Sequence, residues 1–252
     1  MSDTVIADGV GSVMRLTLNR PDKRNALNSE TIDALHEALE NAEADPGIRV
    51  VAISGAGKDF CAGADLAELL DSVDLTPDEN SAQAQRLGDV FVKVRNLPKP
   101  VVAVVTGRAL AGGCGFASAC DIVLAHEDAS FGYPEVRRGF VPAMVMAMLR
   151  RCVGEKVAFD LVGTGRLLSA TEAMQVGLVS RVLPADGFED SVNALLNALG
   201  SSSASAIALI KRQLYELDGR SFEEGIALGA KVNAVARATP DFKESVSKFL
   251  KK

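Results

Sequence analysis

Hydrophobic residues in the first half of the chain follow two spacings in turn, one typical of strands and the other of helices. Residues 12–18 alternate apolar and polar side chains, which predicts a strand with one buried face. Residues 49–54, 101–105 and 122–125 are almost continuously apolar, as in parallel strands that are covered on both faces. The segments between these strands are long enough for helical crossovers, so we expect parallel pairing with right-handed connections.

Between the strands, apolar residues recur three and four positions apart, which predicts helices. Ser29 is placed to cap the first of these helices, and a second helix is expected to begin near Asp65. The polar stretch 71–81 is expected to form a mobile loop. The apolar stripe that runs from Leu87 to Val94 then predicts a third helix.

After residue 142 the strand pattern fades, and helical patterns continue to the end of the chain. These patterns cover about 142–151, 155–162, 170–176, 187–199, 203–216, 221–237 and 241–250, with one strand-like piece at 178–182. We therefore expect a sheet-bearing α/β core followed by a mostly helical region that buries apolar faces on the core and on another subunit.

The composition is that of a folded globular protein, since 48% of the 252 residues are hydrophobic and 24% are charged. The net charge of 27 − 33 = −6 argues against a broad nucleic-acid-binding surface. Two histidines exclude a histidine-rich metal site, and we expect no bound metal. The longest apolar run, residues 140–149, is far shorter than the roughly 20 residues of a membrane-spanning helix, so no membrane partner is expected.

The four cysteines form no C-x-x-C pair, which excludes a zinc ribbon and a thioredoxin-type motif. In a chain of this length they are typical of small buried residues in a reducing compartment. Residues 1–4 lack the basic and apolar regions of a signal peptide. These features predict a cytoplasmic protein.

Two glycine-rich segments, 60–65 and 110–115, each connect a predicted strand to a predicted helix. Such a turn exposes backbone N–H groups at the positive end of a helix, where they can hold a developing anion. If the two turns face each other, they form a two-donor oxyanion site; tight packing of helices on the sheet is the alternative explanation.

Downstream of the second turn, Glu135 lies among apolar and aromatic residues such as Phe131 and Tyr133. An apolar environment raises the pKa of a carboxyl group and suits it to acid–base chemistry. An ordinary surface glutamate is the alternative interpretation.

Eight short motifs stand out beyond this periodicity. They are Asn19–Pro21, Asn25–Leu27, Phe60–Leu66, Lys99–Gly107, Ala109–Asp121, Phe131–Gly139, Ser169–Ala173 and Gly177–Val179. Together and in this order they resemble the enoyl-CoA hydratase/isomerase family, also called crotonases, over about residues 10–250. The resemblance implies an α/β fold with a crotonase-like core of repeated ββα units over 1–195. It also implies a helical C-terminal trimerisation region over 196–252, in a homotrimer or hexamer.

The resemblance also implies an acyl-CoA substrate, with no cofactor beyond its CoA moiety. The oxyanion hole falls on the backbone N–H groups of Ala64 and Gly112, which would polarise the thioester carbonyl. Ala62 matches the position whose backbone carbonyl reads the adenine. Lys23 and Arg24 lie in the loop that commonly reaches the CoA phosphates, with a solvated turn as the alternative. Further CoA-binding positions in these motifs are Ala26, Asp65 and Leu66.

Hydratases of this family often carry two catalytic glutamates, of which Glu135 matches the second while Gly115 stands at the position of the first. The resemblance implies hydration of the 2,3 double bond of an enoyl-CoA through a thioester enolate. The bacterial branch it most resembles acts on branched or carboxylated substrates such as methylglutaconyl-CoA. A Δ3,Δ2-enoyl-CoA isomerase that uses Glu135 alone is the main alternative. The remaining alternatives are decarboxylase or hydrolase chemistry and acyl-CoA binding without turnover.

Two features of this sequence leave substrate contacts open. Arg137 and Arg138 beside Glu135 either meet a second carboxylate of the substrate or are solvated surface charges. Many family members continue past Phe249 and Lys252 with a tail that helps to cover the CoA of a neighbouring subunit. The sequence therefore does not decide whether Phe249 and Lys252 contact CoA.

Overall fold

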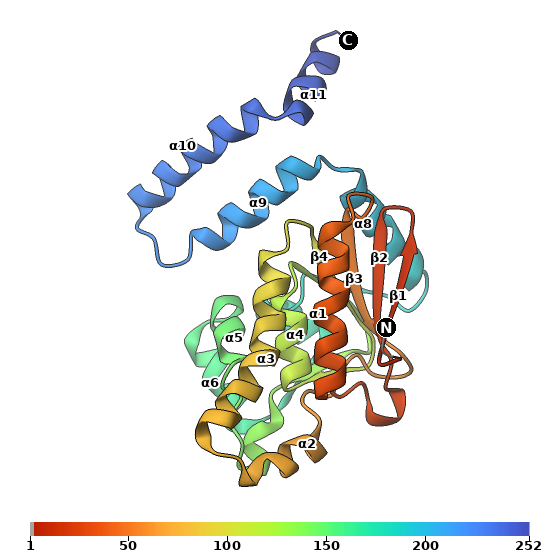
Figure 1. Cartoon of the computed structure of the whole chain (residues 1–252), viewed down its shortest axis with the longest axis vertical. Coiled ribbons are helices and arrows are strands. Elements are labelled where there is room, and N and C mark those ends of the chain that lie inside the picture. Colours follow the sequence, from red (N-terminus) through yellow and green to blue (C-terminus); the bar gives the residue numbers. More distant parts are fainter. Residues whose placement is uncertain (1–2, 252) are drawn as a thin grey trace.

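A six-stranded sheet forms the centre of the protein (Figure 1), as described for residues 3–251 by a computed structural model. The strand order is β1-β2-β3-β4-β6-β9, in which β1 pairs antiparallel with β2 and all other neighbours are parallel. The strands are β1 Val5–Val10, β2 Val13–Leu18, β3 Val50–Gly55, β4 Val101–Val105, β6 Ile122–His126 and β9 Arg181–Leu183. The predicted strands and their parallel pairing are confirmed, and β1 is an addition to the prediction.

Helices occupy most of the remaining described residues. The α-helices are α1 Ser29–Ala44, α2 Leu66–Asp71, α3 Pro77–Asn96, α4 Gly112–Ala119, α5 Met146–Cys152, α6 Glu155–Thr164, α7 Ala170–Gln175, α8 Phe188–Ser201, α9 Ala204–Glu216, α10 Phe222–Ala238 and α11 Pro240–Leu250. Short 3-10 helices are η1 Pro21–Lys23, η2 Ser72–Asp74 and η3 Pro134–Arg138. The helical patterns predicted after residue 142 are confirmed, with bounds shifted by a few residues.

Alternate residues of the central strands point to opposite faces of the sheet, and helices cover both. Val51 and Ile53 of β3 belong to the core that includes α1, α3 and α4. Val50 and Ala52 of the same strand face α8 on the other side. This double coverage explains why β3 and β4 are almost continuously apolar in the sequence.

A second, smaller sheet carries part of the candidate site. Its strands are β5 Arg108–Leu110, β7 Ser130–Gly132 and β8 Leu167–Ser169, in that order. β5 and β7 are parallel, and β7 and β8 are antiparallel. Because β5 leads into α4 and β7 leads into η3, this sheet holds the second glycine-rich turn close to the segment that contains Glu135.

The last three helices extend away from the core, with α10 and α11 beyond α9 (Figure 1). Neither α10 nor α11 buries a residue within the described chain, whereas α9 buries Lys211. Exposed apolar residues on these helices, and at the end of α9, are Ile210, Leu214, Leu217, Phe222, Ile226, Val235, Phe242, Val246, Phe249 and Leu250. The division after residue 195 stays a proposal; it falls within α8, whose Leu196 still packs against the sheet.

Lys211 anchors α9 to the core through polar contacts. Its Nζ lies 2.8 Å from Asp121 Oδ2 and donates to the carbonyl oxygens of Val94 and Lys99 at 2.8 and 3.0 Å. Tyr215, one turn later, donates its hydroxyl to Asp121 Oδ1 at 2.5 Å. A buried ammonium group needs such partners because its desolvation is costly, so these contacts fix how α9 lies on the core.

Two local predictions were wrong. The stretch 71–81 contains the end of α2, a short 3-10 helix and the first turn of α3, and it is not a mobile loop. Thr76 and Glu79 form a reciprocal capping box at its start, which satisfies free N–H groups of the helix. The cap of α1 is Asn28, not Ser29, because Asn28 Oδ1 accepts from the Thr31 N–H at 3.0 Å.

Among residues 3–251, no single helix has the length and apolar composition of a membrane span. The pair α8 and α9 passes that test jointly, with a bend of 101° between the two helices.

Candidate active site

The first glycine-rich turn lies alongside the segment that precedes α1. Leu27 donates its N–H to the carbonyl oxygen of Gly63 at 2.8 Å, and Asp65 donates to the carbonyl oxygen of Leu27 at 3.0 Å. These bonds form a parallel bridge between Leu27 and Ala64. In such a bridge the N–H of the middle residue points away from its partner strand, so the Ala64 N–H is directed away from Leu27.

The second turn contains a strained residue at the start of α4. Ala111 has φ 52° and ψ −126°, a left-handed backbone conformation that costs a residue with a side chain about 1–3 kcal/mol. Its N–H donates to the carbonyl oxygen of Gly132 at 2.8 Å, which ties the turn to the end of β7. This geometry places Gly112 first in the helix, where its N–H lacks an acceptor within the helix.

The two turns are in contact, and both offer a free donor. A Cβ atom on Gly63 would lie 2.9 Å from the backbone nitrogen of Gly112, and one on Gly112 would lie 3.5 Å from that of Ala64. Within residues 3–251, neither the Ala64 N–H nor the Gly112 N–H has a hydrogen-bond acceptor. Two neighbouring free donors, one of them at a helix N-terminus, form an arrangement that can stabilise an oxyanion.

Glu135 lies in η3 and is 8% exposed. Its Oε2 atom is buried and has no hydrogen-bond partner among the described residues. Burial raises the pKa of this carboxyl group above its ordinary value. The segment that leads to Glu135 is tied to the start of α4, because Gly132 accepts the Ala111 N–H at 2.8 Å.

The space beside Gly115 is filled by a residue that the sequence did not single out. A Cβ atom on Gly115 would lie 2.1 Å from Cγ1 of Val145, which is buried at the start of α5. An apolar side chain therefore occupies the space that any side chain at position 115 would need. No local signal predicts this contact, because the two residues are brought together only by the packing of α4 and α5.

The other predicted site residues lie around the first turn with different exposures. Lys23 and Arg24 are exposed on η1 and its C-terminal end, while Ala26 is buried. The Ala62 N–H donates to the carbonyl oxygen of Arg24 at 3.0 Å, which ties the cationic segment to the turn. The remaining two, Asp65 and Leu66, are a half-buried cap of α2 and its exposed first residue.

Arg137 and Arg138 are exposed and take part in no ion pair among the described residues. Phe249 is also exposed, and Lys252 lies outside the described residues.

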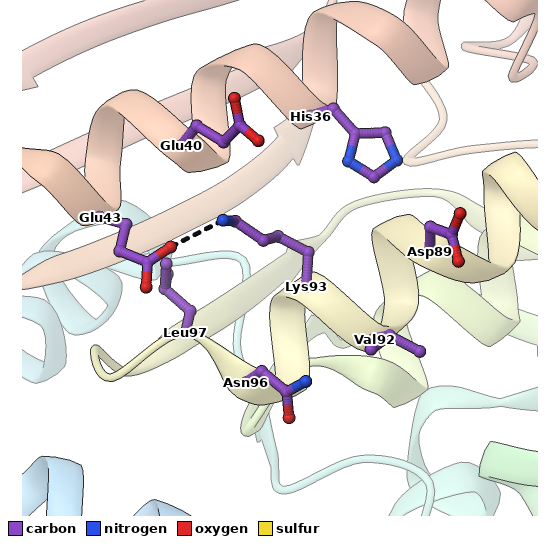
Figure 2. A pocket seen from close by; sticks show the side chains of 8 residues that line it. All are labelled: His36, Glu40, Glu43, Asp89, Val92, Lys93, Asn96 and Leu97. Atoms are coloured by element: carbon purple, nitrogen blue, oxygen red, sulfur yellow. Dashed lines mark hydrogen bonds and ion pairs between the residues drawn. The ribbon is translucent and has the colours of Figure 1, made fainter.

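A separate groove of about 400 Å³ runs between α1 and α3 (Figure 2). Its lining residues are His36, Glu40, Glu43, Asp89, Val92, Lys93, Asn96 and Leu97. Lys93 Nζ pairs with Glu43 Oε2 at 2.7 Å, so part of its charge is neutralised internally. The groove contains none of the predicted site residues, and no group of three or more metal-ligating side chains gathers anywhere in residues 3–251.

Comparisons with known proteins agree with one another. The family model described as enoyl-CoA hydratase/isomerase matches residues 8–252. A Thermus thermophilus protein provisionally named an enoyl-CoA hydratase is 43% identical over 242 residues, covering 96% of both chains. The 2,3-dehydroadipyl-CoA hydratase of Escherichia coli is 36% identical and covers 95% of this chain and 92% of its own. The crystal structure of an enoyl-CoA hydratase from Mycobacterium smegmatis superposes with a TM-score of 0.94 at 32% identity, covering 99% and 97%.

Proposed function

The chain belongs to the enoyl-CoA hydratase/isomerase family, and from that membership we propose that it adds water across the 2,3 double bond of an enoyl-CoA. The observation that carries the proposal is the pair of free N–H groups at Ala64 and Gly112, together with the buried, unpartnered carboxyl group of Glu135, whose segment is tied to the second turn by the Ala111–Gly132 hydrogen bond. Two donors and one carboxyl group are the parts that enolate chemistry on a thioester requires.

We assign the two N–H groups to the thioester oxygen of the substrate. When the water oxygen bonds to C3, the π electrons of the double bond shift toward the carbonyl group and place negative charge on the thioester oxygen. Donors already aimed at this position need no reorganisation during the reaction, and each such donor contributes about 3–4 kcal/mol to transition-state stabilisation.

Glu135 supplies the proton transfers. Its carboxylate takes one proton from the attacking water as the oxygen–carbon bond forms at C3. The same proton then returns to C2, or C2 takes a proton from solvent while Glu135 loses its own. A raised pKa suits this cycle, because the carboxylate accepts a proton more readily than an ordinary glutamate does.

The CoA moiety is proposed to lie along the segment next to the first turn. The exposed Lys23 and Arg24 provide positive charge for its phosphates on an otherwise acidic protein. The backbone carbonyl of Ala62 is proposed to read the adenine. Further positions proposed to line this site are Ala26, Asp65 and Leu66.

For the acyl group we propose a substrate that carries a branch or a second carboxylate, of which methylglutaconyl-CoA is one type. Support comes from the E. coli relative, whose named substrate, 2,3-dehydroadipyl-CoA, is derived from a dicarboxylic acid. Arg137 and Arg138 follow Glu135 directly and lack acidic partners among the described residues, so they are the proposed contacts of that carboxylate.

We also propose a homotrimer or hexamer, with the region after residue 195 as its contact surface. The exposed apolar residues of α9, α10 and α11 support this assembly, since a monomer would leave them in water. The four free cysteines support a reducing, cytoplasmic location.

Purified protein incubated with crotonyl-CoA and with 3-methylglutaconyl-CoA tests the function. We expect loss of the enoyl-thioester absorbance together with formation of a 3-hydroxyacyl-CoA. Release of free CoA or of carbon dioxide would instead identify hydrolase or decarboxylase chemistry. Tight CoA binding without turnover of any substrate would identify a binding protein.

A Δ3,Δ2-enoyl-CoA isomerase is the second candidate, favoured by the contact between Gly115 and Val145. That contact leaves Glu135 as the carboxyl group at this place, and one carboxyl group is enough to move a proton from C2 to C4. A 3-enoyl-CoA substrate separates the two candidates. Accumulation of the conjugated 2-enoyl thioester without hydroxyacyl-CoA identifies the isomerase.

A further inference from the structure

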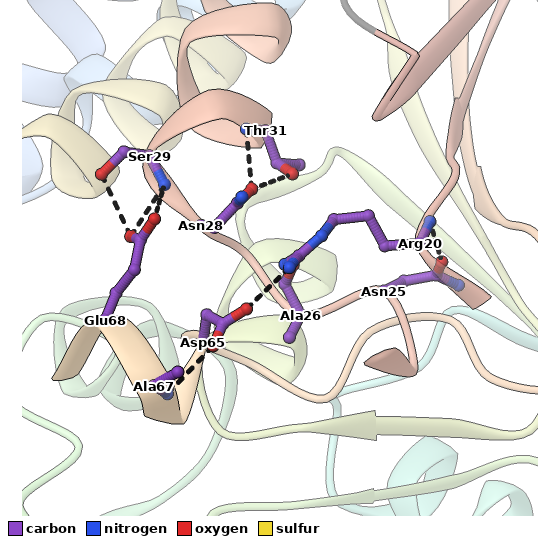
Figure 3. Close-up of polar contacts among 9 residues, drawn as sticks. All are labelled: Arg20, Asn25, Ala26, Asn28, Ser29, Thr31, Asp65, Ala67 and Glu68. Atoms are coloured by element: carbon purple, nitrogen blue, oxygen red, sulfur yellow. Dashed lines mark hydrogen bonds and ion pairs between the residues drawn. The ribbon is translucent and has the colours of Figure 1, made fainter. Parts of the chain in front are cut away.

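Side-chain contacts join residues 20–29 to residues 65–68, at the end of the first turn (Figure 3). They add to the backbone bridge between Leu27 and Ala64. The guanidinium group of Arg20 lies 2.8 Å from Asp65 Oδ2, and the two side chains are 17% and 14% exposed. Another nitrogen of the same group donates to the carbonyl oxygen of Ala26 at 2.6 Å. Arg20 therefore holds one residue in each segment at the same time.

The residues that Arg20 contacts are direct neighbours of the bridge that aims the proposed donor. Ala26 precedes Leu27, and Asp65 follows Ala64, so the two contacts lie on opposite strands of the Leu27–Ala64 bridge. Asp65 Oδ1 also accepts from the Ala67 N–H at 3.0 Å and caps α2. A shift of the Asp65 carboxylate would therefore move the peptide that carries the Ala64 N–H.

A second side-chain contact, between Ser29 and Glu68, joins the same two segments beyond the bridge. The carboxylate of Glu68 accepts from the Ser29 N–H at 2.9 and 3.1 Å and from the Ser29 hydroxyl at 3.0 Å. This contact joins the start of α1 to α2. The bridge between Leu27 and Ala64 thus lies between two side-chain contacts, of which the one with Arg20 is nearer to the donor in the sequence.

We propose that Arg20 is a positioning residue that fixes the Ala64 N–H for the thioester oxyanion, by holding Asp65 and Ala26 on the two strands of the bridge. The inference rests on the proposed function, because it assigns a task to a donor of that reaction. The planar fork of arginine reaches two acceptors in different directions, whereas a lysine ammonium group lacks this preset geometry. Arg20 does not touch the substrate in this scheme.

The first test measures kcat and KM for crotonyl-CoA in Arg20→Ala and Arg20→Lys. A donor displaced by a fraction of an ångström to 1 Å loses transition-state stabilisation, so kcat should fall about 10- to 100-fold in Arg20→Ala. KM should change by less than about threefold, because ground-state binding depends little on this donor. Arg20→Lys should give an intermediate kcat, and it keeps the test usable if Arg20→Ala does not fold.

Arg166→Ala is the matched control. Arg166 also bridges two carboxylates, those of Asp160 and Glu172, at 2.6 and 2.7 Å, and neither of these is a proposed site residue. It should lower the thermal midpoint without changing kcat. If the Arg20 variants lose thermal stability to a similar extent and keep the wild-type kcat, Arg20 has a structural role and the proposal is wrong.

A spectroscopic measurement reads the donor directly and does not depend on turnover. Butyryl-CoA labelled with ¹³C at the thioester carbonyl binds without reacting, since it has no double bond. The carbonyl stretch should move to lower frequency on binding to the wild type and to Arg166→Ala. In Arg20→Ala and Arg20→Lys it should move back toward the value of free butyryl-CoA, and an unchanged stretch would overturn the proposal.

The wild-type measurements separate this inference from the function on which it rests. A wild type that neither turns over any enoyl-CoA nor shifts the bound carbonyl stretch would refute the proposed function itself. A wild type that does both, with Arg20 variants that match it in kcat and in the stretch, would refute the positioning role alone.

Discussion

The two glycine-rich turns each supply one backbone donor, yet different kinds of contact hold them. The first turn is joined to residues 20–29 by an ion pair, by side-chain caps and by a backbone bridge. The second turn is held by backbone hydrogen bonds to Cys61 and Gly132 and by close packing, since a Cβ atom on Gly113 would lie 2.3 Å from the carbonyl oxygen of Cys61. Side-chain polar contacts therefore support the first turn, and close packing supports the second turn, on the two sides of the proposed oxyanion site.

This difference has a consequence for how each turn tolerates change. Individual hydrogen bonds contribute about 0.5–1.5 kcal/mol, so the first turn can lose one polar contact and still hold an approximate geometry. A packed interior has no such margin, because even one added methylene is felt by its neighbours. The polar contacts of the first turn can thus be weakened one at a time by substitution, whereas the closely packed glycines of both turns leave little room for an added side chain.

The largest expected effect on kcat is that of removing the carboxylate of Glu135, the proposed base. Glu135→Gln keeps the shape of the side chain but removes the base, so kcat should fall about 10²- to 10⁴-fold. The remaining rate measures the transition-state stabilisation that the two backbone donors provide without proton transfer by Glu135. Single-turnover assays with crotonyl-CoA check this, and a variant within about twofold of wild type would show that Glu135 is not the base.

Gly63→Ala should have the next largest effect, because its methyl group would enter the space between the turns. The added Cβ would lie 2.8 Å from Cβ of Ala111 and 2.9 Å from the nitrogen of Gly112, and the residue has φ +95°. Loss of one oxyanion donor lowers kcat about 10²- to 10³-fold. Gly187→Ala is the control, since it shares a positive φ of +72° but has open space around it. It should lose stability and keep kcat.

Gly113→Ala tests the packed turn through stability. Its Cβ would overlap the carbonyl oxygen of Cys61 at 2.3 Å, so the free energy of unfolding should fall by about 1–3 kcal/mol. Urea denaturation measures this change. Gly154→Ala, where a Cβ meets nothing within 4 Å, should cost much less. Equal losses at the two sites would contradict the description of the second turn as held by packing.

The smallest expected effect is a pH-dependent gain in stability when Glu135 is neutralised. Burial raises the pKa of Glu135 in the folded state, so the folded protein binds this proton more tightly than the unfolded chain. Stability is then lost as the pH rises from the ordinary carboxyl pKa through the raised value. Glu135→Gln should therefore unfold at a higher temperature than wild type at pH 7, and the difference should vanish at a pH below the ordinary pKa.

The buried strands and the amphipathic helices of the fold were predictable because burial imposes a period on the sequence. The strands of the second sheet are three residues long, too short for a period, and their pairing depends on contacts between distant segments. The start of α3 was predictable in principle, since Thr76, Pro77 and Glu79 form a recognisable helix start. The polar composition of residues 71–81 obscured that signal.

At the candidate site, the sequence pointed to both turns and to Glu135, and the structure brings the two turns into contact. Their roles stay predictions until activity is measured. The exposed positions of Lys23 and Arg24 agree with a cationic rim for CoA. Sequence reasoning could not find the Arg20 contacts or the Val145 wall, because each depends on where a side chain from a separate segment ends up in the folded chain.

The Gly115–Val145 contact also limits how a second carboxylate could be introduced by substitution. A side chain larger than hydrogen at position 115 collides with Cγ1 of Val145 at 2.1 Å. A smaller residue at position 145 leaves only a small cavity, which a folded protein can absorb at modest cost. A second carboxylate at position 115 therefore requires Val145 to move or to become smaller, so the two positions have to change together.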